Sequence, residues 1–245
     1  MKALSFALAL CLTIVAIATA ILSGPLYQSG QIQLEGALQA LQLASVLAVA
    51  GALCGILAAI LIRPRKPFMQ GILALCLLSA GVSFYVTYTT LQDAREAPHI
   101  SDVTTDTENP PQFDALLSRR QEARVPHEYP GEQIAELQRQ HYSDIQTLHT
   151  NVTSASVFRA AQQVVQTKGW QLVAVDNDGG IIEASDTTSW LGFEQDIVIR
   201  IQHDGRSTVV DVRSVSRNEE QDLGTNAKRV RAFLHELQGR LGIAG

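Results

Sequence analysis

Cysteine is missing from residue 77 to the end of this 245-residue chain. All three cysteines, Cys11, Cys54 and Cys76, lie in the apolar first part of the sequence, where cysteine behaves as a small hydrophobic residue. The remaining part therefore has no disulfide, no thiol nucleophile and no cysteine-based zinc site. A domain formed there must be stabilised by its core.

Charged residues are nearly missing from the first 92 residues. Between Lys2 and Arg63 the only charged residue is Glu35, and there is none from Pro67 to Gln92. A helix needs about 20 apolar residues to cross a hydrocarbon layer of about 30 Å. Three segments have this length, namely residues 3–22, 38–62 and 68–91. The sequence therefore predicts a membrane anchor over residues 1–92 with three transmembrane helices in a lipid bilayer.

The few basic residues near the ends of these segments predict the orientation, because basic residues favour the cytoplasmic side. Lys2, Arg63, Arg65 and Lys66 lie on one side, and Arg95 alone follows the third segment. This distribution predicts a bacterial inner-membrane protein with a cytoplasmic N-terminus. Residues 93–245 would then lie on the periplasmic, extracytoplasmic side.

Small residues in the first two segments leave two alternatives open. Ala18-Thr19-Ala20 resembles the cleavage site of an export signal, although the length of the segment favours an uncleaved anchor. Gly51 and Gly55 lie one helical turn apart, a spacing that lets another helix approach closely. That helix belongs either to the same anchor or, by self-association, to a second copy of the chain.

Residues 93–245 are acidic, with 15 Lys and Arg against 23 Asp and Glu, a formal charge of −8. Nucleic-acid binding requires a cationic face that neutralises phosphates. The composition therefore argues against a nucleic acid as partner.

The same residues are predicted to form one α+β domain. A proline-punctuated segment at 99–113 and an irregular stretch at 114–151 precede the regular part. Residues 152–241 predict a helix that ends at Gly169, four strands, and a last helix beginning at Asp222 or Thr225. This order predicts a two-layer sandwich in which helices cover one face of an antiparallel sheet.

Asp178-Gly179 and Asp204-Gly205 each lie between two apolar runs, the pattern typical of a β-hairpin. A two-residue turn at the second site would pair Ile199 with Val210, and Asp196 with Arg213. Alternation along the strands would then place the apolar side chains beneath the helices. The charged side chains would lie on the opposite face, which is either solvated or a surface for a polar ligand or partner.

The soluble part resembles a known family in several ordered motifs. They are SDVTTDTENPP at 101–111, GFEQDIVIRI at 192–201, VDVRSVSR at 210–217 and DLGTNAKRVRAF at 222–233. Together they resemble the uncharacterised domain-of-unknown-function family 1499, found in bacterial envelope proteins and plastids. The resemblance spans about residues 99–241. It implies no settled activity.

Several polar groups could carry chemistry. Asp102, Asp106 and Glu108 supply hard oxygen ligands, but their spacing fits no calcium loop and favours a structural loop. Glu183 lies inside an apolar strand, where it either pairs with Arg200 or Arg213 or acts as an acid–base group. We therefore expect neither a metal nor a cofactor.

The approach to the last helix offers an alternative anion site. The basic residues near its predicted N-terminus, where free backbone amides bind anions, are Arg213, Arg217, Lys228, Arg229 and Arg231. Asp222 or Thr225 could equally cap the helix.

These features predict a membrane-anchored envelope protein whose domain is a non-enzymatic binding or scaffolding module for a partner protein or small polar ligand. The candidate surface comprises Asp102, Thr104, Thr105, Asp106, Asn109, Glu183, Asp196, Arg200, Asp211, Arg213, Ser214, Arg217, Asn226 and Arg229. One alternative is a carboxylate- or metal-dependent enzyme that uses Asp102, Asp106 and Glu183. A second is an assembly factor for a membrane complex.

Overall fold

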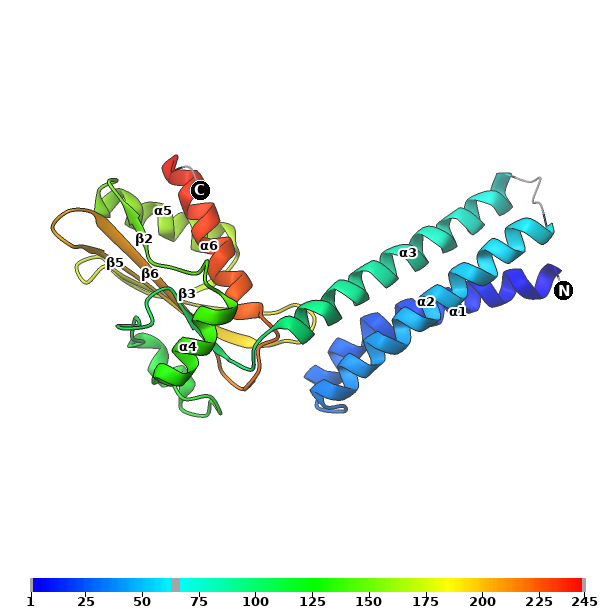
Figure 1. Cartoon of the computed structure of the whole chain (residues 1–245), viewed down its shortest axis with the longest axis horizontal. Helices are drawn as coiled ribbons and strands as arrows, with labels where there is room; N and C mark the ends of the chain where they lie inside the picture. Colours follow the sequence, from blue (N-terminus) through cyan, green and yellow to red (C-terminus); the bar gives the residue numbers. More distant parts are fainter. Residues whose placement is uncertain (1, 63–66, 244–245) are drawn as a thin grey trace. The chain divides into compact units, whose positions relative to one another are not determined.

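The computed structural model describes residues 2–62 and 67–243, which form two compact units (Figure 1). One unit contains the helices before residue 97 together with residues 190–192. The other contains residues 97–189 and those from 193 onward. Each unit is described by itself below.

The first unit consists of three long helices, α1 (Lys2–Gln28), α2 (Leu34–Ile62) and α3 (Pro67–Glu96). Each is long and apolar enough to cross a membrane. The prediction of three long apolar helices is therefore confirmed. The first helix runs past residue 22, the end of the predicted segment, through Gly24 and Pro25 to Gln28.

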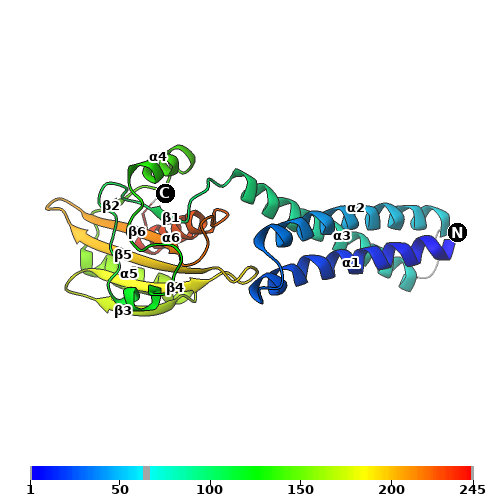
Figure 2. The same cartoon turned by 90° about the horizontal axis from the view of Figure 1, so that it is seen from below.

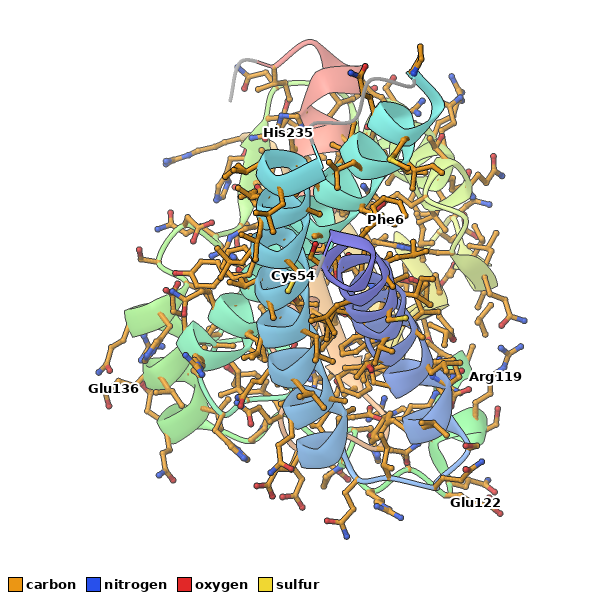
Figure 3. The ribbon with its side chains drawn as sticks, turned by 90° about the vertical axis from the view of Figure 1, so that its right-hand side faces the viewer. Phe6, Cys54, Arg119, Glu122, Glu136 and His235 are labelled. Carbon is orange, nitrogen blue, oxygen red and sulfur yellow. The ribbon has the colours of Figure 1, made fainter. Side chains whose placement is uncertain are left out.

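Small residues bring the three helices together. Ala16, Ala48 and Ala80, one from each helix, form a buried cluster. A Cβ atom added to Gly51 would lie 2.9 Å from Thr13 Oγ1 on α1, and one added to Gly55 would lie 3.1 Å from Leu77 on α3. Figure 3 labels Cys54, which lies between these glycines on α2. Both glycines thus serve packing within the unit, and self-association stays a prediction.

The second unit is an α+β domain with one antiparallel sheet (Figure 2). Its strands are β1 (Asp102–Thr104), β2 (Leu148–Thr150), β3 (Gln171–Asp176), β4 (Ile181–Thr187), β5 (Glu194–His203) and β6 (Thr208–Ser216). Their order is β1-β6-β5-β4-β3, and β2 pairs with β6 beyond the end of β1. The predicted α+β class and the four predicted strands are confirmed. The short strands β1 and β2 were not predicted.

The helices of the domain are α4 (Glu132–His141), α5 (Ser154–Thr167) and α6 (Thr225–Leu241), with a 3-10 helix η1 (Ala115–Arg120). Apolar side chains from α5 and α6 pack on one face of the sheet, against Ile197, Ile199 and Val212 among others. Trp170 and Phe233 stack with ring centroids 5.9 Å apart. Each such buried side chain contributes about 1.5–3 kcal/mol to folding, so this layer forms the main core.

The predicted register of the second hairpin is wrong by two residues. Ile199 pairs with Val212, and Arg213 pairs with Val198. The last pair is His203 with Thr208, so the turn has four residues instead of two. The Asp204 carboxylate stabilises this longer turn by accepting the backbone N–H groups of Arg206 and Ser207 at 2.8 and 2.7 Å. A shift of two preserves the faces, because side chains alternate with a period of two.

The opposite face of the sheet is not solvated. Phe113, Leu116 and Val125, from η1 and the loops around it, form a second buried cluster with Val198 and Val215 of the sheet. Irregular chain thus covers the face that carries the charged side chains. Those charged side chains therefore lie inside the domain, where they need partners within the chain.

Candidate functional site

Arg213 is the centre of the buried polar face. Its side chain is fully buried and donates two hydrogen bonds to the Asp102 carboxylate, of 3.0 and 2.7 Å. The guanidinium lies over the rings of Phe113 and Tyr129, 5.3 and 5.5 Å from their centroids. The remaining donors bind the backbone carbonyls of Pro111 and His127. Burial raises the pKa of Asp102, and the charge of Arg213 opposes this shift.

Asp196 joins a second buried group of charges. Its carboxylate accepts hydrogen bonds from Arg120 at 2.9 Å, from Arg217 at 2.9 and 2.7 Å, and from the Ser185 hydroxyl at 2.9 Å. Burial lowers the pKa of Arg120, whereas the hydrogen bond to Asp196 raises the pKa of Arg217. One carboxylate therefore pairs with two guanidinium groups from distant parts of the chain, and Arg217 pairs with Glu194 as well, at 3.3 Å.

Arg200 links the sheet to the segment that follows β1. It donates to Asp106 at 3.0 Å, to Asp211 at 2.8 Å and to the carbonyl of Asn109 at 2.9 Å. Asp211 also accepts the hydroxyl of Thr105 at 3.1 Å. Arg200 and Asp211 face each other directly across β5 and β6. These contacts hold the loop after β1 against the sheet.

Glu183 is a helix cap. Its carboxylate accepts the backbone N–H groups of Asp114, Ala115 and Leu116 at 2.9, 3.1 and 2.8 Å. These amides begin η1 and have no partner within the helix. The charge of Glu183 is thus used to hold η1 on the sheet, and the predicted ion pair with Arg200 or Arg213 is wrong.

The N-terminus of α6 is capped from within the chain. The Asp222 carboxylate accepts the backbone N–H groups of Gly224 and Asn226 at 2.8 and 2.6 Å, and its pKa is raised by burial. The Asn226 side chain accepts the Ser214 hydroxyl at 2.6 Å and donates to the carbonyl of Ser101 at 3.0 Å. The capping alternative of the sequence analysis is the one observed.

Arg213, Arg217 and Arg229 do not converge on an anion at this helix end. Arg213 binds Asp102 and Arg217 binds Asp196. Arg229 donates from Nε and Nη2 to one oxygen of Asp186, and from Nη1 to the Gln195 side chain. Each guanidinium is thus matched with an acidic side chain of the domain.

Most of the predicted surface residues are therefore internal. Those that are buried are Asp102, Thr104, Thr105, Glu183, Asp196, Asp211, Arg213, Ser214, Asn226 and Arg229. Asp106, Arg200 and Arg217 are partly buried, and Asn109 is exposed. The structure brings these residues together, but as a network that joins the sheet to its cover.

The three carboxylates of the enzyme hypothesis have different partners. Asp102 pairs with Arg213, Asp106 pairs with Arg200, and Glu183 accepts backbone N–H groups at the start of η1. In the part of the chain that the structure describes, no group of three His, Cys, Asp or Glu side chains could hold a metal ion.

Several residues of this buried polar network were not predicted from the sequence. Arg120, Gln138 and Ser185 are buried and bonded to Asp196 or to the backbone of β1. Gln138 of α4 donates to the carbonyl of Thr104 at 2.7 Å and accepts its N–H at 2.9 Å. Neither Arg120 nor Gln138 belongs to a periodic pattern, so nothing in the sequence marks them as internal.

An open groove lies between the start of α5, the turn from β3 to β4 and the end of β5. Its volume is about 760 Å³, and its lining combines polar and apolar surface in similar amounts. The lining side chains and loop residues are Ser154, Ala155, Phe158, Arg159, Gln162, Asn177, Asp178, Gly179, Gly180, Ile201, Gln202 and His203. None of them belongs to the predicted surface. The groove is therefore a concave, accessible site that the buried network leaves unused.

Comparison with known proteins identifies the family of the domain. A family model described as protein of unknown function (DUF1499) matches residues 102–237, more than half of the chain. The matched residues include β1, the whole of the sheet, and α6 up to Leu237. A search of curated proteins gives no match. The chain therefore belongs to the DUF1499 family, as the motifs along the sequence indicated.

Proposed function

We propose that the chain is a membrane-anchored envelope protein whose α+β domain is a non-enzymatic binding or scaffolding module. The observation that carries this proposal is the use of the polar side chains. Nearly every charged group on the inner sheet face is neutralised by a partner within the domain. Such a network fixes the shape of a domain, whereas a catalytic group must be accessible to its substrate.

The groove beside α5 is the proposed binding site for a polar segment of a partner protein or a small polar ligand. Its volume of about 760 Å³ lies within the range of about 300–1,000 Å³ that is typical of ligand sites. Phe158 and Ile201, both buried, supply apolar area to its lining, and Arg159, Asp178 and His203 supply donors and acceptors. Polar groups that fix the orientation of a ligand beside apolar area are typical of specific recognition.

Blocking the groove should abolish partner binding. In Gln162→Trp a bulky ring replaces a partly buried side chain in the groove lining. Recovery of a defined partner with the full chain from detergent extracts should fall at least about tenfold, the effect of losing about 1.4 kcal/mol of binding free energy. The measurement is quantitative mass spectrometry of the co-purified proteins.

Gln166→Trp is the matched control, because Gln166 is an exposed residue of the same helix outside the groove lining. It should retain full recovery. Equal recovery with both variants would contradict the groove as the binding site.

The proposed location is the bacterial inner membrane, with residues 93–245 on the periplasmic side. The support is the excess of basic residues at Lys2, Arg63, Arg65 and Lys66 over the single Arg95. Protease added outside intact spheroplasts should digest residues 93–245. The same protease added to inverted inner-membrane vesicles should leave them intact.

A tag fused to the N-terminus is the internal control for that experiment, because it should show the opposite pattern of protection. Digestion of residues 93–245 in the inverted vesicles alone would contradict the proposed orientation.

A further inference from the structure

The polar side chains of the groove differ from those of the inner sheet face in their lack of partners. Arg200 and Arg213 on the sheet are bound by carboxylates of the domain. Within the described ranges 2–62 and 67–243, no hydrogen bond or ion pair involves the side chains of six lining residues, namely Arg159, Gln162, Asn177, Asp178, Gln202 and His203. Their capacity to bind is therefore open to a ligand.

Arg159 and Asp178 place opposite charges in the same groove. Arg159 comes from α5, and Asp178 comes from the turn between β3 and β4. A guanidinium binds a carboxylate, and a carboxylate binds an ammonium group. A ligand that carries both charges therefore satisfies both side chains. Because such a ligand has no net charge, the formal charge of −8 on residues 93–245 neither attracts nor repels it at long range.

Three amide side chains of the lining match the groups of a peptide backbone. Gln162, Asn177 and Gln202 each present an acceptor oxygen and an NH₂ group that donates. A peptide group likewise presents one acceptor and one donor, so an amide side chain can bind it in both directions. The lining therefore suits the alternating donors and acceptors of a short peptide.

The turn that carries Asp178 is held in place before any ligand arrives. Asp176 Oδ1 accepts the backbone N–H groups of Asp178 and Gly179 at 3.1 and 2.9 Å. The carbonyl of Gly180 accepts the N–H of Ile201 at 2.8 Å, and a Cβ atom on Gly180 would lie only 2.1 Å from the carbonyl oxygen of Ile201. A site that is already formed loses less conformational entropy on binding.

We propose that the groove binds a short zwitterionic peptide, with the peptide's carboxylate at Arg159 and its ammonium group at Asp178. The amide side chains then bind the peptide groups of the ligand. This inference rests on the binding function proposed above and narrows it, because it names the chemical class of the ligand.

The test is a titration of the full-length protein in detergent by isothermal calorimetry. The probe is triglycine, which has one ammonium and one carboxylate group near neutral pH. N-acetyltriglycine lacks the ammonium group, and triglycine amide lacks the carboxylate. Triglycine should bind at least about threefold more tightly than either analogue, because each analogue loses one charge pair at a partly exposed site.

Two substitutions assign the charges of the groove to the two ends of the ligand. Arg159→Gln should weaken the binding of triglycine at least about threefold, but it should leave the binding of triglycine amide unchanged, since that probe has no carboxylate. Asp178→Asn should weaken the binding of triglycine to the same extent and leave that of N-acetyltriglycine unchanged. A general disturbance of the groove would instead weaken the binding of all three probes.

Arg119→Gln and Glu122→Gln are the matched controls. Each removes one charge from an exposed position outside the groove lining, and Figure 3 labels both residues. Both variants should bind triglycine as tightly as the wild type does. Gln162→Trp, which fills the groove, should abolish the binding of all three probes.

Three results overturn the proposal: a wild type that does not bind triglycine, equal affinities of the wild type for the three probes, and variants of Arg159 and Asp178 that weaken all three probes alike. The pull-down with Gln162→Trp separates these results from a failure of the proposed function. If that variant loses its partner while the wild type does not bind triglycine, the groove remains the binding site and only the class of its ligand is wrong.

Discussion

Replacing Arg213 by methionine should lower the free energy of unfolding of the domain by about 3–5 kcal/mol, because removal of one partner leaves a buried charge without compensation. The charge left without a partner would be the Asp102 carboxylate, which is 1 % exposed and accepts two hydrogen bonds from Arg213. Two backbone carbonyls would also lose their donor. A loss of this size is a large part of the total stability of a domain, typically about 5–15 kcal/mol.

Hydrogen exchange of the full chain in detergent, followed by mass spectrometry on peptides of β5 and β6, measures this loss as faster exchange of the most protected amides. Arg206→Met is the control, because Arg206 is exposed in the turn between these strands and should change stability by no more than about 0.5 kcal/mol. Adding Asp102→Leu to Arg213→Met should restore part of the stability, since it removes the abandoned charge. A loss below about 1 kcal/mol for Arg213→Met alone would show that water reaches Asp102.

Asp196→Asn should have the second-largest effect, a loss of about 3 kcal/mol, because it removes the carboxylate that pairs with the buried Arg120. The guanidinium of Arg217 also loses this carboxylate but keeps its 3.3 Å ion pair with Glu194. These two groups differ in access to water. The side chain of Arg120 is 1 % exposed, whereas that of Arg217 is 14 % exposed. Arg217 can turn toward water, but Arg120 cannot. Most of the predicted loss therefore comes from Arg120.

A double-mutant cycle tests this unequal division. Arg217→Gln alone should cost about 1 kcal/mol, as for a partly exposed ion pair. Arg120→Met alone should cost more, and its combination with Asp196→Leu should cost at least about 1 kcal/mol less than the sum of the single changes. Equal coupling energies of Asp196 with both arginines would contradict the assignment. The readout is again the exchange rate of the β5 and β6 amides.

Helices α5 and α6 and the two hairpins could be predicted because their signals are local, whereas α4 and η1 lie in the stretch at 114–151 that was expected to be irregular. The apolar stripe of α6 and the Asp-Gly turns lie within a few residues of the elements that they define. The prediction of the register of the second hairpin was wrong for a local reason as well. Asp204 and Gly205 suggested a two-residue turn. The Asp204 side chain accepts the backbone N–H groups of Arg206 and Ser207, which stabilises a turn of four residues.

The sequence could predict which residues share the charged face of the sheet, but not that this face is buried. Alternation along β5 and β6 placed Asp196, Arg200, Asp211 and Arg213 on one face, and the structure agrees. The cover over that face was not predictable, since the chain that forms it has no periodicity. Arg120 lies 76 residues from its partner Asp196, and no short-range pattern connects the two. A polar sheet face was therefore interpreted as a surface when it is an interior.

The position of β1 restricts when the domain can fold during synthesis. This strand is the first of the domain to leave the ribosome, yet it pairs with β6, the last strand. Its Asp102 binds Arg213, which lies 111 residues further along the chain. Pairing over such a separation cannot begin before the distant strand exists. Strand β1 must therefore stay unpaired, with the Asp102 carboxylate hydrated, until nearly the whole chain has been made. The proposed periplasmic location would require such a delay, because a translocation channel carries an unfolded chain.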